Sequence, residues 1–170
     1  MDAEAERPPI DLSELRDARA RGRRNFRNLK LRDLDGVDLD LTDCDLRDSC
    51  FKGARFGRAS LRRAQLESCS FQQALLWGAD LSGSQLQGAD FSDAFLHRTY
   101  LRGIVAAGSH WVEARLVEAD FRSSLDQLTD LRHTDLRGCD LRDCSLDGTL
   151  MENAQCDGER FKRCTEERTF

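Results

Sequence analysis

Apolar residues recur at every fifth position over most of this chain. These central positions keep one unbroken register from Phe26 to Phe161, and only Gly36 and Asp126 fail to supply an apolar side chain. A small or compact residue stands two positions before most centres, and Asp, Arg, Ser, Gln and Gly fill most of the remaining positions. On an α-helix this spacing would wind the centres around the axis, and along a straight strand successive centres would point to opposite faces. The chain must therefore bend once in every repeat.

Glycine marks the predicted bends. It recurs two positions after a centre, where a turn can use backbone angles that glycine adopts without strain. Within a repeat the small residue and the centre are two positions apart, so both face the same side of a short extended segment. The pattern predicts a solenoid in which each coil buries its apolar residues against its neighbours. The glycines at these bends are Gly53, Gly78, Gly83, Gly88, Gly103, Gly108, Gly138, Gly148 and Gly158.

Individual repeats resemble those of the pentapeptide-repeat family, as in Ala79-Asp80-Leu81-Ser82-Gly83 and Ala89-Asp90-Phe91-Ser92-Asp93. The resemblance covers residues 24–163. It implies an all-β fold, a right-handed quadrilateral parallel β-helix with four repeats per coil and about seven coils. A twenty-residue period then places four large rings in one interior column, those of Phe51, Phe71, Phe91 and Trp111.

The sequence divides into three parts. Residues 1–23 are predicted to form an N-terminal tail and capping helix, residues 24–163 the pentapeptide-repeat β-helix, and residues 164–170 a C-terminal tail. A chain of 170 residues that is 39% hydrophobic fits one domain. It has no stretch long enough to span a membrane and no basic-then-apolar leader, so we expect no membrane span and a cytoplasmic location.

A short helix is predicted for Asp11–Arg21. Asp11 and Glu14 have the spacing of a capping box, and Gly22 stands where the helix should end. We expect the helix to lie across the first coil, because the strand edges and apolar end of that coil would otherwise be exposed. Larger residues replace the usual small ones in the first coil and offer the helix apolar surface, namely Leu29, Leu34 and Leu39.

The C-terminal end has no comparable helix. After Phe161 only nine residues remain, too few to cover a coil of about twenty residues. Two copies meeting end to end about a twofold axis would cover this end, as in gyrase-binding members of the family, so a homodimer through the C-terminal end is one expectation. The alternative is that Phe170 folds back over the last coil as a plug.

The break at Asp126 predicts a local distortion. In a rigid register this carboxylate would point into the core, which is costly unless the charge is paired. We expect the chain to bulge, with Asp126 turned outward and Leu125 or Leu128 turned inward. Apart from this bulge, the unbroken register predicts no inserted loop.

The sequence contains no arrangement typical of catalysis. His97, His110 and His133 occupy non-equivalent outward positions, and the many Asp residues follow from the repeat itself. Seven cysteines lie mostly at interior small-residue positions, where Cys substitutes for Ala, and a bridge between Cys144 and Cys164 is the alternative. We therefore expect no enzyme activity, no catalytic residue, no cofactor and no metal.

The charges are unevenly distributed. Eight basic residues lie between Arg16 and Arg32, against Asp17 alone, and they indicate either a surface for nucleic acid or anionic lipid, or a cap neutralised by the acidic coils beneath it. The second interpretation is favoured. Residues 51–120 carry seven acidic and eight basic residues, so they lack the uncompensated acid with which some members of the family mimic DNA and bind DNA gyrase. In repeats such as Asp130-Leu131-Arg132, stacked coils are expected to pair opposite charges.

Six residues form the candidate partner-binding site. They occupy outward positions of one predicted face, where the repeat elsewhere supplies Asp, Ser or Arg, and adjacent coils would gather them into an apolar, aromatic patch. The sequence thus predicts a non-enzymatic rigid scaffold or interaction module that binds a protein partner, whose identity the repeat does not encode; nucleic acid is not an expected partner. The alternative is a DNA-mimicking binder or regulator of a type II topoisomerase, DNA gyrase. The six residues are Leu75, Trp77, Phe95, His97, Arg115 and Val117.

Overall fold

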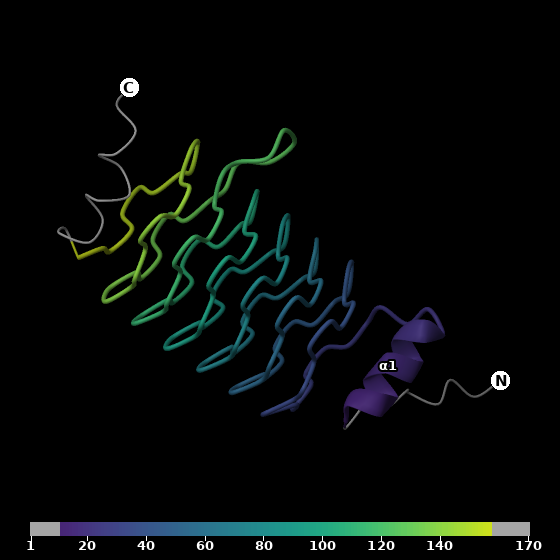
Figure 1. The fold of residues 1–170 in the computed structure, drawn as a ribbon. Coiled ribbons are helices and arrows are strands. Elements are labelled where there is room, and N and C mark those ends of the chain that lie inside the picture. The colour runs from purple at the N-terminus through teal and green to yellow at the C-terminus, as the bar shows by residue number, and fades with distance from the viewer. Residues whose placement is uncertain (1–10, 158–170) are drawn as a thin grey trace.

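The computed structural model describes residues 11–157, which wind into a rod of stacked coils. Helix α1, Leu12–Ala20, lies at one end of the rod (Figure 1). The strand segments of the coils are single parallel bridges, which recur at every fifth residue and link residues twenty apart, from Asn25 with Asp45 to Tyr100 with Asp120. Four bridges per twenty residues give each coil four sides. The predicted β-helix with four repeats per coil is therefore present, while part of the predicted seven coils falls on residues 158–163, outside the described residues.

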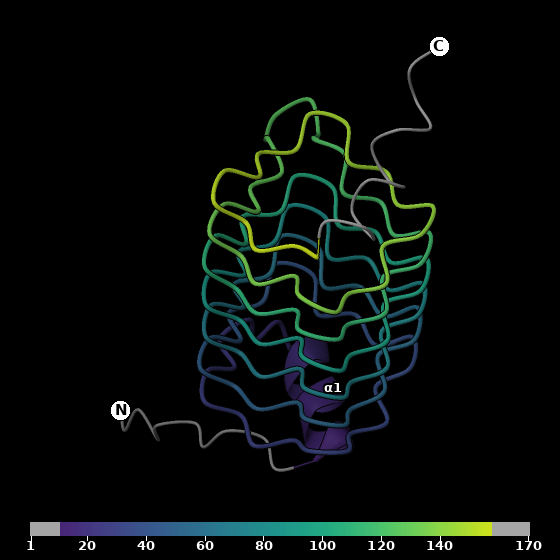
Figure 2. The same cartoon turned by 90° about the vertical axis from the view of Figure 1, so that its left-hand side faces the viewer.

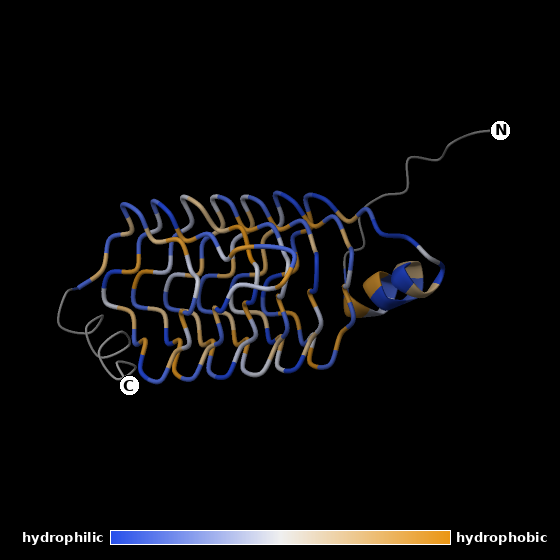
Figure 3. Cartoon of the chain, turned by 90° about the horizontal axis from the view of Figure 1, so that it is seen from above, coloured by the Kyte–Doolittle hydropathy of each residue, from blue (hydrophilic) through white to orange (hydrophobic). Residues whose placement is uncertain are grey.

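The centres and the small residues fill the interior of the rod. Figure 2 shows the coils lying one above the other, so that equivalent positions form columns along the axis. Figure 3 shows hydrophobic and hydrophilic residues alternating along each coil. This alternation follows from the repeat, because the centre and the residue two before it point inward while the other three positions point outward or turn the corner.

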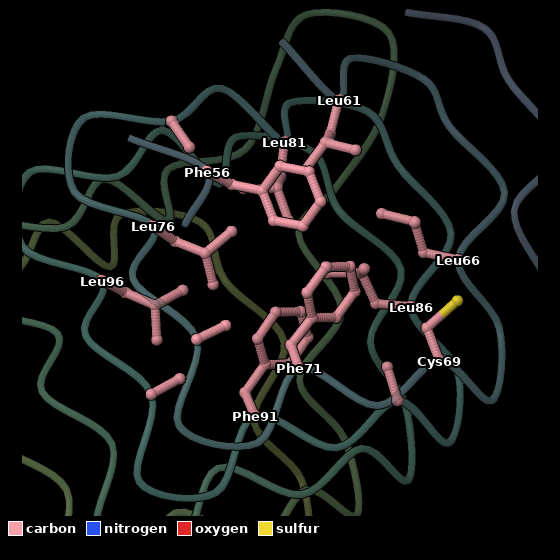
Figure 4. Packing of buried hydrophobic residues seen from close by; sticks show 14 of the residues in the cluster. Phe56, Leu61, Leu66, Cys69, Phe71, Leu76, Leu81, Leu86, Phe91 and Leu96 are labelled. Atoms are coloured by element: carbon pink, nitrogen blue, oxygen red, sulfur yellow. The ribbon is translucent and has the colours of Figure 1, made fainter. Parts of the chain in front are cut away.

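The predicted column of large rings is confirmed. The ring centroids of Phe51 and Phe71 are 5.3 Å apart, those of Phe71 and Phe91 4.9 Å, and those of Phe91 and Trp111 4.2 Å, all in stacked orientation. In Figure 4 the rings of Phe71 and Phe91 lie one behind the other, beside a second column that contains Leu76 and Leu96. None of the four rings has any exposed surface. Stacked aromatic pairs of this kind add about 0.5–1.5 kcal/mol each beyond the burial of their area.

The break in the pattern at Gly36 has a steric cause. Gly36 occupies a buried central position, and a Cβ atom there would lie 2.9 Å from Cε1 of Phe56. The glycine thus leaves room for the ring that Phe56 brings from the next coil. A leucine at position 36 would compete with this ring for the same volume.

Helix α1 has the ends that the sequence predicts. The side chain of Asp11 accepts a hydrogen bond of 2.9 Å from the backbone N–H of Glu14. At the other end, the N–H of Gly22 donates to the carbonyl of Arg19 and the N–H of Arg23 donates to that of Ala18, the paired bonds of a Schellman motif. Leu15 is completely buried against the core that begins with Phe26, Leu29 and Leu34.

A loop interrupts the stack after Phe121, at the place where the sequence predicts a bulge, but it is a complete inserted loop, which the unbroken register did not predict. Beyond Tyr100 and Asp120 the bridges link residues twenty-five apart, as in Val105 with Asp130, and the spacing returns to twenty at Asp130 with Leu150. One complete repeat is therefore excluded from the coil, and Leu131 takes the place above Ala106 that the register assigns to Asp126. In Figure 1 this loop is the green segment that projects beyond the corners of the other coils.

The loop turns its apolar residues outward, which corrects the prediction for Leu125 and Leu128. Asp126 points outward as predicted, but Leu125 is fully exposed and Leu128 is 54% exposed. Thr129 fills the interior position instead, where its hydroxyl accepts a hydrogen bond from the N–H of Gly103 and donates one to the carbonyl of Arg122. Because Thr129 already fills the core beneath the loop, neither Leu125 nor Leu128 has to turn inward.

Hydrogen bonds across its base hold the loop in place. The backbone N–H and the hydroxyl of Ser124 both donate to the carbonyl of Gln127, and the hydroxyl of Ser124 accepts from the N–H of Gln127. The hydroxyl of Ser123 accepts from the N–H of Thr129 and donates to the carbonyl of Gly148 in the next coil. These bonds close a turn whose tip carries Leu125 and Asp126.

Ion pairs on the outer surface follow two patterns. Four acidic residues pair with an Arg twenty residues away in the next coil, the pairs being Asp35–Arg55, Asp38–Arg58, Asp43–Arg63 and Glu118–Arg98. In the repeats for which the sequence predicted pairing between coils, the acid pairs with the Arg two positions later in the chain, as in Asp120–Arg122, Asp130–Arg132, Asp135–Arg137 and Asp140–Arg142. The two residues lie two positions apart on the same side of one strand, so their side chains reach each other within one coil. The predicted pairing between coils is also found at Asp120, which pairs with Arg102 of the preceding coil.

The buried cysteines are structural. The thiol of Cys139 donates to the carbonyl of Trp111 at 2.7 Å, and that of Cys69 to the carbonyl of Leu46 at 3.0 Å. Burial raises the pKa of each of these two thiols to about 12, which keeps them protonated and unreactive. Cys144 is also buried, and its thiol donates to the carbonyl of Leu116 at 2.9 Å. Its proposed bridge partner Cys164 lies outside the described residues, so this bridge stays a prediction.

Excision of the looped-out repeat should leave the fold unchanged. Removal of residues 124–128 joins Ser123 to Thr129 and creates the regular repeat Phe121-Arg122-Ser123-Thr129-Asp130-Leu131. We expect the free energy of unfolding to change by less than about 1 kcal/mol, because only loop entropy and local hydrogen bonds change. Urea unfolding followed by circular dichroism measures this. As a control, excision of residues 84–88 moves Phe91 out of the aromatic column and should cost several kcal/mol. If excision of residues 124–128 lowered the free energy of unfolding as much as excision of residues 84–88, the looped-out repeat would not be residues 124–128.

The paired carboxylate of Asp120 should make stability depend on acid pH. Burial raises the pKa of Asp120, but hydrogen bonds from Arg122 and Arg102 outweigh this effect and lower it to about 2, below the ordinary value. The resulting stabilisation is present above about pH 4 and is lost as the pH falls through 2. We expect Asp120→Asn to destabilise the protein by about 1 kcal/mol at pH 7 and by less than half of this at pH 2. The control is Asp93→Asn, because Asp93 makes no ion pair among residues 11–157. If Asp120→Asn lowered the free energy of unfolding equally at pH 7 and pH 2, the dependence of stability on the ionisation of Asp120 would be refuted.

Candidate aromatic interface

The six candidate residues lie together on one side of the rod, and we call them the aromatic patch: Leu75, Trp77, Phe95, His97, Arg115 and Val117. Parallel bridges join Leu75 to Phe95 and Phe95 to Arg115, so these three form one column across successive coils. Backbone hydrogen bonds place the other three at equivalent positions of the same coils, since Arg58 donates to the carbonyl of Trp77, Gly78 to that of His97 and Arg98 to that of Val117. The repeat spacing alone produces this gathering.

Two aromatic rings dominate the surface of the patch. Trp77 is 42% exposed and Phe95 38% exposed, while Leu75 and Val117 are half-buried between them and the coil. A guanidinium lies over each ring: Cζ of Arg58 is 4.9 Å from the centroid of Trp77, and that of Arg115 is 4.6 Å from the centroid of Phe95. Such contacts hold the rings in place and leave each of them partly exposed.

Gly57 gives Trp77 its position. A Cβ atom on Gly57 would lie 2.4 Å from Cε2 of the indole, so the ring rests directly on the backbone of the coil beneath it. Because Gly57 has no side chain, its outward position leaves the space that the indole of Trp77, the largest residue of the patch, occupies. Sequence reasoning missed this role of Gly57, although a glycine twenty residues before an outward tryptophan is the signal that predicts it.

The remaining polar groups of the patch offer little chemistry. Nε2 of His97 lies 3.9 Å from Oε1 of Glu118, and a hydrogen bond from Arg98 lowers the pKa of that glutamate. No nucleophile is placed beside the histidine by any hydrogen bond within residues 11–157. In the same part of the chain, no three His, Cys, Asp or Glu side chains are arranged to hold a metal ion.

Two shallow hollows flank the faces of the rod. One, of about 540 Å³, lies beside the patch and is lined by Phe95, Arg115, Asp93 and Glu113, among others. The second, of about 830 Å³, lies between the loop and the coils and is lined by Tyr100, Arg102, Ser124 and Gln127, among others. The sequence did not indicate either hollow, because each forms where residues from different sides of the coil meet at a corner or under the loop.

The basic N-terminal segment is partly neutralised by the first coils. Arg19 pairs with Asp40 at 2.9 Å, and Arg27 lies 3.7 Å from both Asp45 and Asp48. These contacts agree with the interpretation of a basic cap on acidic coils. They do not extend to every basic residue of the segment.

Comparison with known proteins identifies the repeat. The family model described as pentapeptide repeats matches eight copies, over residues 25–63, 40–78, 64–103 and 128–165. The chain belongs to the pentapeptide-repeat family. Membership implies the right-handed quadrilateral β-helix, which agrees with the four-sided coils described above. The matches of this pentapeptide-repeat chain leave out residues 104–127, the stretch that leads into the loop.

Solved structures similar to this chain are also pentapeptide-repeat proteins. HetL of the cyanobacterium Nostoc, involved in the regulation of heterocyst differentiation, is 20% identical, with a TM-score of 0.49 over 86% of this chain and 95% of that chain. A trypsin-treated form of QnrB1, a plasmid-mediated fluoroquinolone resistance protein, is 20% identical, with a TM-score of 0.41 over 86% and 88% of the two chains. Rfr23 of the cyanobacterium Cyanothece is 17% identical, with a TM-score of 0.36 over 86% and 100%. No curated protein matches the sequence significantly. Within residues 11–157 there is no helix long and apolar enough to cross a membrane.

A methyl group at Gly57 should displace Trp77. The backbone of Gly57 does not use a positive φ angle, so Gly57→Ala changes little except the space beneath the indole. We expect the fluorescence emission to shift to longer wavelength, because Trp77 becomes more exposed while the other tryptophan, Trp111, stays buried. The same substitution in a Trp77→Phe background is the control and should leave the emission of Trp111 unchanged. An unaltered spectrum of Gly57→Ala would show that the position of Trp77 does not depend on this space.

Proposed function

We propose that this protein is a rigid, non-enzymatic interaction module that binds a protein partner through the aromatic patch. The observation that carries the proposal is the pair of exposed rings, Trp77 and Phe95, held against the coils by Gly57, Arg58 and Arg115. Exposed aromatic residues of this kind, flanked by Arg, are the residue types that dominate binding energy at protein interfaces. Because both rings are already fixed, binding costs little conformational entropy.

The rod supports this role by its rigidity. Each coil is joined to the next by backbone hydrogen bonds on all four sides, as with Leu76 to Phe95 at 2.7 Å and Phe95 to Ala74 at 2.9 Å. The patch residues therefore keep their spacing without help from a partner.

The alternative is a DNA-mimicking binder or regulator of a type II topoisomerase. Mimicry requires rows of uncompensated carboxylates, whereas many acidic residues of the described coils pair with arginine, among them Asp38, Asp43, Asp120 and Asp135. We therefore favour binding through the patch over mimicry of a nucleic acid. The homodimer expected through the C-terminal end involves residues 158–170, outside the described residues, and stays a prediction.

Removal of both rings should abolish association. We expect Trp77→Ala combined with Phe95→Ala to lower partner retention about tenfold or more in a quantitative pull-down from the native cell, because two central aromatic anchors are lost. The melting temperature should change little, since both side chains lie outside the core.

The matched control for this experiment removes apolar side chains elsewhere. Tyr100 and Leu125 are at least as exposed as the two rings but lie outside the patch, so Tyr100→Ala with Leu125→Ala should leave retention unchanged. Equal retention of all partners by the patch variant and the wild type would refute the proposal.

A further inference from the structure

The charges at the ends of the aromatic patch form a symmetric pattern along the rod. Three outward columns cross this face, and the two outer ones begin with an acidic residue, continue with a basic one, pass an uncharged middle, and then return through a basic residue to an acidic one. The column between them carries Trp77, His97 and Val117. The bridged column runs Asp35, Arg55, Leu75, Phe95, Arg115, Asp140. The column at the next corner runs Asp38, Arg58, Gly78, Arg98, Glu118. Guanidinium groups therefore stand at both ends of the apolar centre.

These guanidinium groups are available to a partner. Arg115 lies on the ring of Phe95 and makes no ion pair within residues 11–157. The other three make ion pairs of 2.6–3.2 Å, but their side chains remain 55–67% exposed, so the exchange of one carboxylate for another costs little. The pairs are Arg55–Asp35, Arg58–Asp38 and Arg98–Glu118.

One long side of the patch is acidic. Asp93 and Glu113 line the hollow beside Phe95 and Arg115. Along the bridged column the basic groups are thus confined to the two ends, Arg55 and Arg115, whereas Arg98 lies level with Phe95 on the opposite long side. A ligand that carried negative charge along its whole length would be repelled by Asp93 and Glu113. Beyond the basic groups, Asp35 and Asp140 close the column at either end, which opposes a continuous polyanion such as a nucleic acid.

A second copy of the chain complements this pattern only in part. If two rods met in antiparallel directions about the centre of the patch, Arg55 would face Arg115 of the other copy and Asp35 would face Asp140. If they met in parallel directions, Arg55 would face Arg58. Both arrangements thus set like charges against each other, but each also brings Glu118 of one copy to an arginine of the other, Arg58 in the first case and Arg115 in the second. A segment that places carboxylates only on the arginines meets opposite charges alone, and so it complements the pattern better than a second copy does.

We infer that the aromatic patch binds a protein segment whose apolar side chain is flanked at both ends by acidic residues. This inference rests on the proposed function and specifies its partner. Arg55 and Arg115 are three coils apart, which at about 4.8 Å per coil places them about 14 Å from each other. A segment lying along the rod needs its carboxylates at this separation, about four residues apart in an extended chain or about nine in a helix.

The test selects binders from a random peptide library displayed on phage, with the full-length protein as the target. We expect the selected peptides to carry Trp, Phe or Leu between Asp or Glu residues. A synthetic copy of one such peptide should change the fluorescence of Trp77, and Arg55→Glu combined with Arg115→Glu should weaken its affinity at least about tenfold. The control is Arg62→Glu with Arg137→Glu, which changes the net charge equally on other faces and should leave the affinity unchanged.

Each other outcome has a definite meaning. Peptides that need Trp77 and Phe95 but carry basic or no charge would overturn the inference and leave the proposed function intact. If no selected peptide loses affinity in the Trp77→Ala, Phe95→Ala variant, the proposed function itself fails. A wild-type dimer that this variant dissociates, measured by analytical ultracentrifugation, would overturn the exclusion of a second copy. Binding of duplex DNA that Arg55→Glu with Arg115→Glu abolishes would overturn the exclusion of nucleic acid.

Discussion

Backbone hydrogen bonds between coils are the interaction on which the rest of this structure depends. Phe71 donates to the carbonyl of Asp90 at 2.7 Å and Asp90 donates to that of Cys69 at 2.9 Å, and the same exchange recurs on each side of the coil. These bonds fix the distance between coils near the spacing of neighbouring strands, about 4.8 Å. Interior rings can then stack and exterior charges can pair, because the backbone segments that bear these side chains are already held at contact distance. The core adds stability to an arrangement that the backbone defines.

The sequence predicted what depends on the position within one repeat. Burial of the centres, the positive φ of residues such as Gly53 at the bend, and the ends of helix α1 follow from local chemistry and are found in the structure. To predict the stacking of Phe91 on Trp111, only the twenty-residue period of the coil was needed in addition. The composition of the patch was equally predictable, since its members are outward residues of known register.

What the sequence could not predict depends on which repeats meet. An excluded unit of five residues leaves the five-residue register intact, so the count of centres located the break at Asp126 but did not show that a whole repeat leaves the coil. Asp120 pairs both with Arg122 of its own coil and with Arg102 of the preceding coil, and this double pairing depends on side-chain reach, which the pattern does not contain. The same holds for Gly36 and Gly57, each of which accommodates a ring that arrives from twenty residues later.

The loop also shows what a duplicated repeat can do to a rod of this kind. A new repeat with an apolar centre would be wound into the coil, and every face beyond it would rotate by a quarter turn relative to the faces before it. A repeat centred on a charged residue such as Asp126 is expelled, and the faces on both sides of it stay aligned. The exclusion of one whole repeat therefore adds a projection to one corner of the rod without rotating the faces that follow it.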